Sequence, residues 1–193
     1  MRYGFTTGSC AAATAKAAAY MLLSGREKTE ITIETPRGIP YTAQIRNICR
    51  SEREVSCAVE KDGGDDPDIT TGALICAKVS YAKVSSEDPV GASAKVLIDG
   101  GIGVGRVTKP GLDQPVGNAA INHVPREMIE REVLQVCQVM DYRGTLAVEI
   151  SVPEGEQLAE KTFNPRLGIV GGISILGTSG IVEPMSTQAI LDT

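Results

Sequence analysis

Residues 5–24, which read FTTGSCAAATAKAAAYMLLS, constrain the fold of this chain more than any other segment. Alanine has the highest intrinsic helix propensity, and this segment is rich in it. Thr6, Thr7 and Ser9 can each cap the start of a helix, because a side-chain oxygen accepts a hydrogen bond from a free backbone N–H. Gly25 is a typical residue just past a helix end. The sequence therefore predicts a helix whose small alanines allow close packing against a sheet.

A series of strand-like segments follows this helix. In residues 30–34, polar and β-branched apolar side chains alternate, as they do in a half-buried strand. Residues 41–49 alternate less cleanly, and residues 54–60 are expected to be their hairpin partner. The predicted strands comprise residues 30–34, 41–49, 54–60, 73–84, 95–98 and 145–152.

A second helix is predicted at residues 126–140, where apolar residues recur at helical spacing after Pro125, a residue favoured in the first turn. Two helices among mostly consecutive strands indicate an α+β fold and not strictly alternating βα units. We expect residues 1–160 to form an N-terminal domain, a layered α/β sandwich with a mixed sheet and two main helices.

Residues 161–193 differ in character from the rest of the chain. An apolar, β-branched stretch at 167–175 precedes a glycine-rich loop, and a helix is expected to begin at Ser186. A buried strand, a glycine loop and a helix start together open a nucleotide-binding βα unit. We expect the beginning of a second, truncated nucleotide-binding-like domain, or alternatively an extension that packs on the first domain.

Charge and hydropathy exclude several classes of protein. The net charge is −5, and no run of Lys and Arg provides the basic patch of a nucleic-acid-binding protein. No apolar stretch approaches the ~20 residues that span a bilayer. Residues 1–4 lead into the first helix and not into the apolar segment of a signal peptide. We expect a cytoplasmic protein without nucleic-acid or membrane partners, whose oligomeric state the sequence does not indicate.

The five cysteines and the single histidine do not form a metal-binding pattern. No two cysteines have C-x-x-C spacing, and His123 cannot form a histidine cluster. We expect no metal site, and reduced thiols that pack as small hydrophobic side chains. Cys10 is the one thiol whose pKa a helix N-terminus could lower, although packing is its favoured role.

Three loops carry residues that could bind a ligand. At the start of the first helix, hydroxyl groups, Gly8 and free N–H groups could hold an anion, and a simple N-cap explains the same residues. Residues 62–68 contain four aspartates, which could bind a hard metal ion, orient a substrate or act as a general base. Their spacing does not follow the calcium-loop pattern, so a solvated turn is the simpler interpretation.

The third loop, residues 99–106, reads DGGIGVGR after a short strand. Its glycine run matches a dinucleotide-binding fingerprint only loosely, because Pro110 and Gly111 leave no room for the helix that should follow. A loop of this composition can let the backbone lie against a flat ligand, although each glycine could also serve a simple turn.

Together these segments resemble the cobalt-precorrin-5B C(1)-methyltransferase family. The resemblance covers most of the chain, in the family's order. Family members often carry alanine at Gly63 and histidine at Thr71, so no role of that histidine transfers, and they usually carry proline at His123. They are also longer, so we expect an N-terminal portion of such an enzyme. The matching stretches are residues 5–18, 61–72, 98–112, 115–129 and 163–186.

The resemblance implies transfer of a methyl group from S-adenosylmethionine to carbon C-1 of cobalt-precorrin-5B, giving cobalt-precorrin-6A in cobalamin biosynthesis. Cobalt is then part of the small-molecule corrinoid substrate and not a metal of the protein. Because the sulfonium methyl group is already activated, such an enzyme has mainly to align it with the ring carbon and exclude water.

On this resemblance we assign roles to residues of the loops, since the rim of a corrinoid carries several carboxylates. Asp66 is the candidate catalytic residue. The substrate-binding candidates are Thr6, Thr7, Gly8, Ser9, Asp65, Asp68, Asp99, Gly100, Gly101, Gly103 and Gly105. The cofactor-binding candidates, for S-adenosylmethionine, are Gly177, Thr178, Gly180 and Glu183.

Two alternatives remain open. A non-catalytic module would bind the corrinoid without turning it over. A small-molecule kinase would use the glycine-rich loops to bind ATP with magnesium, although the Walker pattern G-x-x-x-x-G-K-[ST] is missing.

Overall fold

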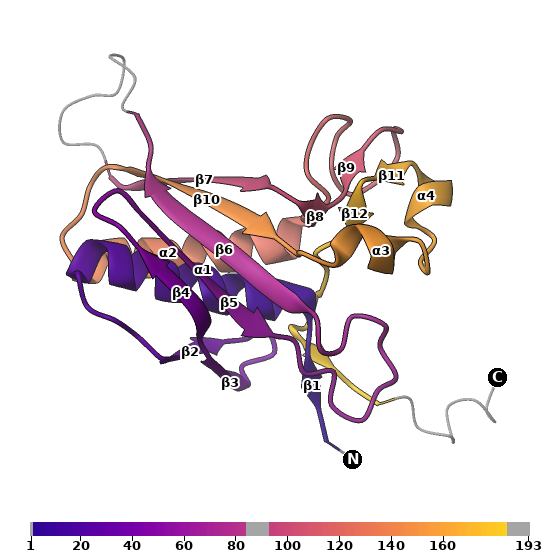
Figure 1. The fold of residues 1–193 in the computed structure, drawn as a ribbon, viewed down its shortest axis with the longest axis horizontal. Coiled ribbons are helices and arrows are strands. Elements are labelled where there is room, and N and C mark those ends of the chain that lie inside the picture. The colour runs from indigo at the N-terminus through magenta and orange to yellow at the C-terminus, as the bar shows by residue number, and fades with distance from the viewer. Residues whose placement is uncertain (1, 84–92, 185–193) are drawn as a thin grey trace.

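A five-stranded sheet, with two long helices packed against one of its faces, makes up most of the structure (Figure 1). The computed structural model describes residues 2–83 and 93–184. The sheet has the order β4-β5-β6-β10-β7 and the helices are α1 and α2. These elements are α1 (Thr7–Ser24), β4 (Arg46–Arg50), β5 (Glu54–Glu60), β6 (Leu74–Tyr81), β7 (Lys95–Gly100), α2 (His123–Val139) and β10 (Thr145–Ser151).

Helix α1 packs against the sheet on one side and against α2 on another, and it begins and ends as its sequence predicts. The Thr6 hydroxyl accepts a hydrogen bond from the Ser9 N–H at 3.2 Å, and Gly25 adopts the left-handed conformation with φ of 69°. The alanines of the helix are all fully buried. Because alanine extends the helix radius so little, the sheet and α2 both approach its backbone closely.

The sheet is mixed, which confirms the predicted α+β fold. Neighbours from β4 to β10 are antiparallel, whereas β10 and β7 are parallel. A parallel pair needs a crossover connection, and α2 lies on the connection between β7 and β10. On β10, Val148 and Ile150 face the helices, while Glu149 points to the open face beside Lys78.

The predicted strand at residues 41–49 is two strands in the structure. Strand β3 (Pro40–Gln44) pairs with β2 (Glu30–Glu34) as a separate hairpin, whereas β4 pairs with β5. The register between β4 and β5 shifts at Asn47, which has a positive φ of 52°. The predicted hairpin between this region and residues 54–60 is correct for β4.

A small lobe lies at one end of the sheet (Figure 1). Its elements come from two distant parts of the chain, because β12 pairs with β8 and β11 pairs with β9. Strand β1 (Gly4–Phe5) pairs in turn with β13 (Ile181–Val182) beside the start of α1. The lobe comprises β8 (Gly103–Val104), β9 (Arg106–Val107), α3 (Gly155–Ala159), α4 (Asn164–Leu167), β11 (Ile169–Val170) and β12 (Gly172–Ile173).

The single buried strand predicted at residues 167–175 is wrong. Leu167 ends helix α4, and Gly171, with φ of 90°, separates the two short strands β11 and β12. The helix start predicted at Ser186 lies outside the described residues, and the division of the chain at residue 160 stays a prediction. No helix within residues 2–83 and 93–184 is long and apolar enough to cross a membrane.

A buried ion pair joins the two long helices. Lys16 Nζ on α1 lies 3.0 Å from Glu132 Oε2 on α2, and the Glu132 side chain is only 5% exposed. Lys16 also donates to the Thr32 carbonyl at 2.9 Å. Although Glu132 Oε2 has no partner in hydrogen-bond geometry, the ammonium lies within ion-pair distance, so the attraction is mainly Coulombic.

We expect Lys16→Met to lower the free energy of unfolding by about 3 kcal/mol, because it removes the nearer cation from the buried Glu132 carboxylate and leaves only half-exposed Arg131, at 3.4 Å from its other oxygen. Urea denaturation followed by circular dichroism measures this change. The double variant Lys16→Met/Glu132→Leu removes both charges and should recover most of the loss. Equal stability of the single variant and the unmodified chain would contradict the assignment.

Candidate functional site

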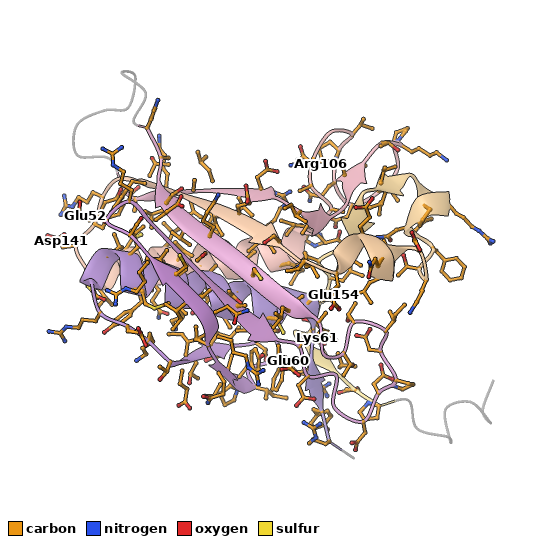
Figure 2. All side chains as sticks on the ribbon, in the orientation of Figure 1. Glu52, Glu60, Lys61, Arg106, Asp141 and Glu154 are labelled. Carbon is orange, nitrogen blue, oxygen red and sulfur yellow. The ribbon has the colours of Figure 1, made fainter. Side chains whose placement is uncertain are left out.

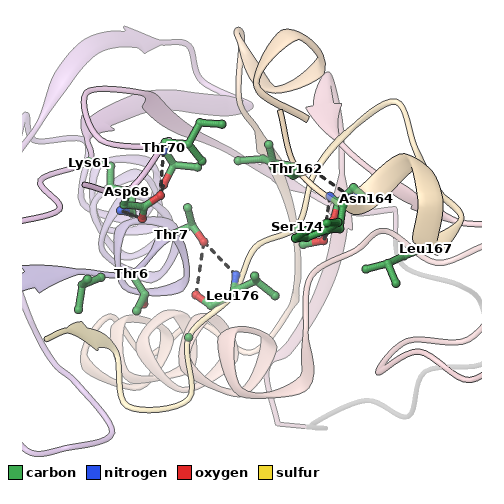
Figure 3. Close-up of a pocket in the computed structure, with 15 residues that line it drawn as sticks. Thr6, Thr7, Lys61, Asp68, Thr70, Thr162, Asn164, Leu167, Ser174 and Leu176 are labelled. Atoms are coloured by element: carbon green, nitrogen blue, oxygen red, sulfur yellow. Dashed lines mark hydrogen bonds and ion pairs between the residues drawn. The ribbon is translucent and has the colours of Figure 1, made fainter. Parts of the chain in front are cut away.

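A cavity of about 380 Å³ lies where the start of α1, the loop after β5 and the segment leading from α3 to β13 meet (Figure 3). We call it the main cavity because distant parts of the chain meet at it, although other hollows, of about 400 to 510 Å³, are larger. Its three walls come from residues 6–7, 61–70 and 162–182. Contacts between residues far apart in the sequence thus form it.

The first wall is the N-terminus of α1, which the chain's own segment 176–180 caps. The Thr7 hydroxyl accepts from the Leu176 N–H at 2.9 Å, and the Gly8 N–H donates to the Leu176 carbonyl at 2.8 Å. The Ser9 hydroxyl donates to the Gly180 carbonyl at 2.6 Å. These bonds occupy Gly8 and fully buried Ser9, so of the four predicted anion-binding residues only Thr6 and Thr7 line the main cavity.

The second wall contains a buried lysine. The Lys61 side chain is 1% exposed, and its Nζ donates to Asp68 Oδ2 at 2.5 Å. The other oxygen of Asp68 accepts from both the N–H and the hydroxyl of Thr70, each at 2.9 Å. The loop therefore holds Asp68 in one orientation beside the lysine.

Asp68 is unsuited to accept a proton at neutral pH. Burial acts to raise its pKa, but the hydrogen bonds from Lys61 and Thr70 outweigh burial and hold that pKa below the ordinary value. A carboxylate with a lowered pKa is a weak base. Asp68 is thus better suited to fix Lys61 than to act as a general base.

The other aspartates of residues 61–72, which we call the acidic loop, do not line the main cavity. Asp62 forms an ion pair with Arg2, whose hydrogen bond is the largest of the effects that lower the Asp62 pKa. Asp65 accepts a hydrogen bond from the Arg2 backbone N–H at 2.6 Å. Asp66, the candidate catalytic residue, is not among the lining residues either, so its catalytic role stays a prediction without geometric support.

The third wall belongs to the small lobe. Asn164 is buried, and its Nδ2 donates to the Gly172 carbonyl at 3.1 Å and to the Ser174 hydroxyl at 3.2 Å. These bonds hold the start of α4 against β12. Figure 3 shows Asn164 and Ser174 on the side of the cavity opposite Lys61 and Asp68.

Exposed apolar side chains surround the mouth of the main cavity. They are Ile69 from the acidic loop and Phe163, Leu167 and Leu176 from the third wall, with Phe163 70% exposed. A group of exposed apolar side chains around a hollow is typical of a binding site. Together with Lys61, the mouth suits a ligand that has both an apolar surface and polar groups.

The glycine loop at residues 99–106 does not line the main cavity, and Figure 2 shows Arg106 in the lobe, apart from Lys61. A Cβ on Gly103 would lie 1.7 Å from the Val152 carbonyl oxygen, and one on Gly105 would lie 2.3 Å from Ile169 Cγ2. The close approach predicted for a flat ligand is therefore made by the chain itself.

Other members of this loop are also engaged within the chain. A Cβ on Gly100 would lie 2.8 Å from Ala119, and one on Gly101 would lie 2.8 Å from Glu149. Asp99 forms an ion pair with Arg106 at 2.8 Å. These contacts within the chain explain why glycines and an aspartate stand at these positions without invoking a ligand. Contact of these residues with substrate stays a prediction.

The four candidate cofactor residues do not share one cavity. Gly177 lines the main cavity, whereas Thr178 lines a separate hollow beside α2. Gly180, with φ of 79°, lies against the Ser9 hydroxyl, and Glu183 forms an ion pair with Arg37. Within the described residues they do not assemble a pocket for S-adenosylmethionine.

The remaining polar candidates have structural partners. Burial raises the pKa of the Cys10 thiol to about 11, which outweighs any effect of the helix start, and Cys10 packs against Tyr41. His123 is the first residue of α2 and forms an ion pair with Asp113. Among the described residues, no group of three or more His, Cys, Asp and Glu side chains could hold a metal ion.

Sequence reasoning missed Lys61, Asn164 and the apolar mouth. A signal for Lys61 was present, because it continues the inward-facing series Val55, Cys57 and Val59 of strand β5. No comparable local signal marks Asn164 or Phe163, whose positions depend on contacts between distant segments.

We expect Gly103→Ala to lower the free energy of unfolding by about 3 kcal/mol or more, since the added Cβ would collide with the Val152 carbonyl. Gly111→Ala is the matched control, because Gly111 also has a positive φ but nothing lies within 4 Å of its Cβ position. It should cost about 1 kcal/mol. Thermal unfolding measures the stability of both variants against that of the unmodified chain. Equal costs would show that the crowding at Gly103 is unimportant.

Comparisons with known proteins agree with the resemblance. The family model named CbiD matches residues 1–184. Proteins named cobalt-precorrin-5B C(1)-methyltransferase from Ruminiclostridium cellulolyticum and Alkaliphilus metalliredigens are each 52% identical over 193 residues. These matches cover 100% of this chain and 48% of each relative, so the chain spans about half their length.

A solved structure shares the fold. It is described as a cobalamin biosynthesis protein (cbiD) from Archaeoglobus fulgidus and superposes with a TM-score of 0.70 at 30% sequence identity. The superposition covers 98% of this chain and 57% of that one.

Proposed function

The chain belongs to the CbiD family, and on this premise we propose that it takes part in the methylation of carbon C-1 of cobalt-precorrin-5B, which gives cobalt-precorrin-6A. The observation that carries this proposal is 52% identity, over the whole chain, to proteins named for that reaction. Because the chain spans 48% of their length, both the reaction and its substrate are proposals for this chain. The proposal places the reaction in the cytoplasm.

The main cavity is the proposed corrinoid-binding site. At about 380 Å³ it lies at the small end of the range for ligand pockets, roughly 300–1,000 Å³. A corrin macrocycle with its side chains would not be enclosed at that volume. We therefore propose that the ring lies across the apolar mouth, on Phe163 and Leu167, while part of its polar rim reaches into the cavity.

S-adenosylmethionine is the proposed methyl donor, and it would supply an activated sulfonium methyl group. The predicted cofactor residues Gly177, Thr178, Gly180 and Glu183 do not line one cavity of this chain, and their contact with the methyl donor stays a prediction. The part proposed for this chain's own residues is to bind the corrinoid, fix its orientation and cover one face against water.

A second candidate function is a corrinoid-binding module without catalysis. The separation of the four cofactor candidates favours this alternative. The kinase alternative gains no support from the comparisons, because the relatives at about half identity are named methyltransferases.

A turnover assay separates the two candidates. The chain is incubated with cobalt-precorrin-5B and S-adenosylmethionine carrying a labelled methyl group, and the corrinoid product is analysed by mass spectrometry. We expect one label at C-1, with ATP and magnesium having no effect. Corrinoid binding without label would favour the non-catalytic module, and the absence of both would contradict the two candidates.

We expect Phe163→Ala to raise the dissociation constant of the corrinoid about tenfold, which corresponds to about 1.4 kcal/mol of lost contact with the ring. Visible absorbance of the corrinoid measures binding directly. Val139→Ala is the control, because Val139 is similarly exposed but lies on α2, away from the main cavity. If the two substitutions change the dissociation constant equally, the proposed role of the apolar mouth in binding is contradicted.

A further inference from the structure

Lys61 is among the largest fully buried side chains of the described residues. It follows strand β5 in the inward-facing series, so the alternation of the strand directs it beneath the acidic loop. It lines the main cavity and also a neighbouring hollow of about 400 Å³ beside Phe5 and Tyr41. The Lys61 side chain thus borders two cavities.

The ammonium group has more hydrogen-bond donors than the protein uses. A lysine has three N–H donors, and among the described residues Asp68 is the acceptor that bonds to Lys61 Nζ, at 2.5 Å. Buried N–H groups are normally satisfied, since leaving them without acceptors costs free energy. Two donors of Lys61 are therefore available to an oxygen acceptor that enters the cavity.

The surroundings of Lys61 favour an anion as that acceptor. Asp68 balances the charge of the lysine, but Thr70 ties its second oxygen and keeps the carboxylate on one side of Nζ. Thr6 and Thr7, which line the same cavity, lie at the positive end of the α1 macrodipole. The nearby Asp62 carboxylate is turned toward Arg2.

We propose that the Lys61 ammonium binds a carboxylate group of the ligand inside the main cavity, where Asp68, held by Thr70, is its ion-pair partner in the free chain. The proposal rests on the proposed function, because the corrinoid is a ligand that combines rim carboxylates with an apolar ring. Lys61 then selects acidic corrinoids over amidated ones, while the apolar mouth holds either ring.

A charge-competition experiment tests this role. Dicyanocobyrinic acid, whose side chains end in free carboxylates, is titrated into the chain at low ionic strength, and its visible spectrum reports binding. Lys61→Met should weaken binding at least about tenfold. Asp68→Asn should leave binding unchanged or tighten it a few-fold, because it removes the negative charge that competes for the same ammonium.

Two controls separate recognition from structure. Lys78→Met removes the same charge from the open face of the sheet, where Lys78 lies opposite Glu149, and should change binding less than about twofold. Dicyanocobinamide has side chains that end in carboxamides. Its dissociation constant for the Lys61→Met variant should lie within about threefold of that for the unmodified chain.

Several outcomes would overturn the proposal. One is that Lys61→Met binds the acid as tightly as the unmodified chain does, and another is that the unmodified chain does not bind the acid. The others are equal losses of affinity for the acid from Lys61→Met and Asp68→Asn, and equal losses of affinity for the acid and the amide from Lys61→Met. If Lys61→Met does not fold, the double variant Lys61→Met/Asp68→Asn, which leaves no unpaired carboxylate, replaces it with the same expected loss.

The binding measurement contains no methyl donor, so the two proposals fail separately. Lys61-dependent binding without methyl transfer would contradict catalysis and support the carboxylate site. If the Lys61→Met variant still transfers the methyl group and binds the acid with unchanged affinity, catalysis is supported and the carboxylate site is overturned.

Discussion

The close packing around α1 is the constraint on which the rest of the structure depends. Its alanines are fully buried, so the sheet contacts one side of the helix and α2 contacts another. A helix that is enclosed in this way cannot shift without opening voids, and voids in a packed interior cost contact energy. The N-terminus of α1 therefore becomes a fixed point, and the Lys16–Glu132 ion pair holds α2 against the same helix.

The segment that follows the small lobe uses this fixed point. Leu176 and Gly180 bond to Thr7, Gly8 and Ser9, which satisfies groups at the helix start that would otherwise face solvent or a ligand. The same bonds hold the lobe opposite the acidic loop, so the main cavity forms between them. The helix start thus serves mainly as an attachment for the lobe, and the charged groups that line the cavity are the ion pair of Lys61 and Asp68.

The glycine and aspartate clusters show where sequence reasoning reaches its limit. A glycine can indicate that another group approaches its backbone closely, but that group can be a ligand or another part of the chain. At Gly103 and Gly105 it is the chain. Among the aspartates, charge alone did not distinguish Asp62 and Asp65, which bond to Arg2, from Asp68, which fixes a lysine in the cavity.

The sequence by itself determined the elements whose signals are local. The caps of α1, the strand at residues 30–34 and the helix after Asn122 depend on neighbouring residues and could be predicted, as could the family from motifs in order. The tertiary structure alone decided the site. Thr7 meets Leu176 across 169 positions, and only folding brings Phe163 to a mouth whose other side carries Ile69, because no local pattern encodes contacts between segments so far apart.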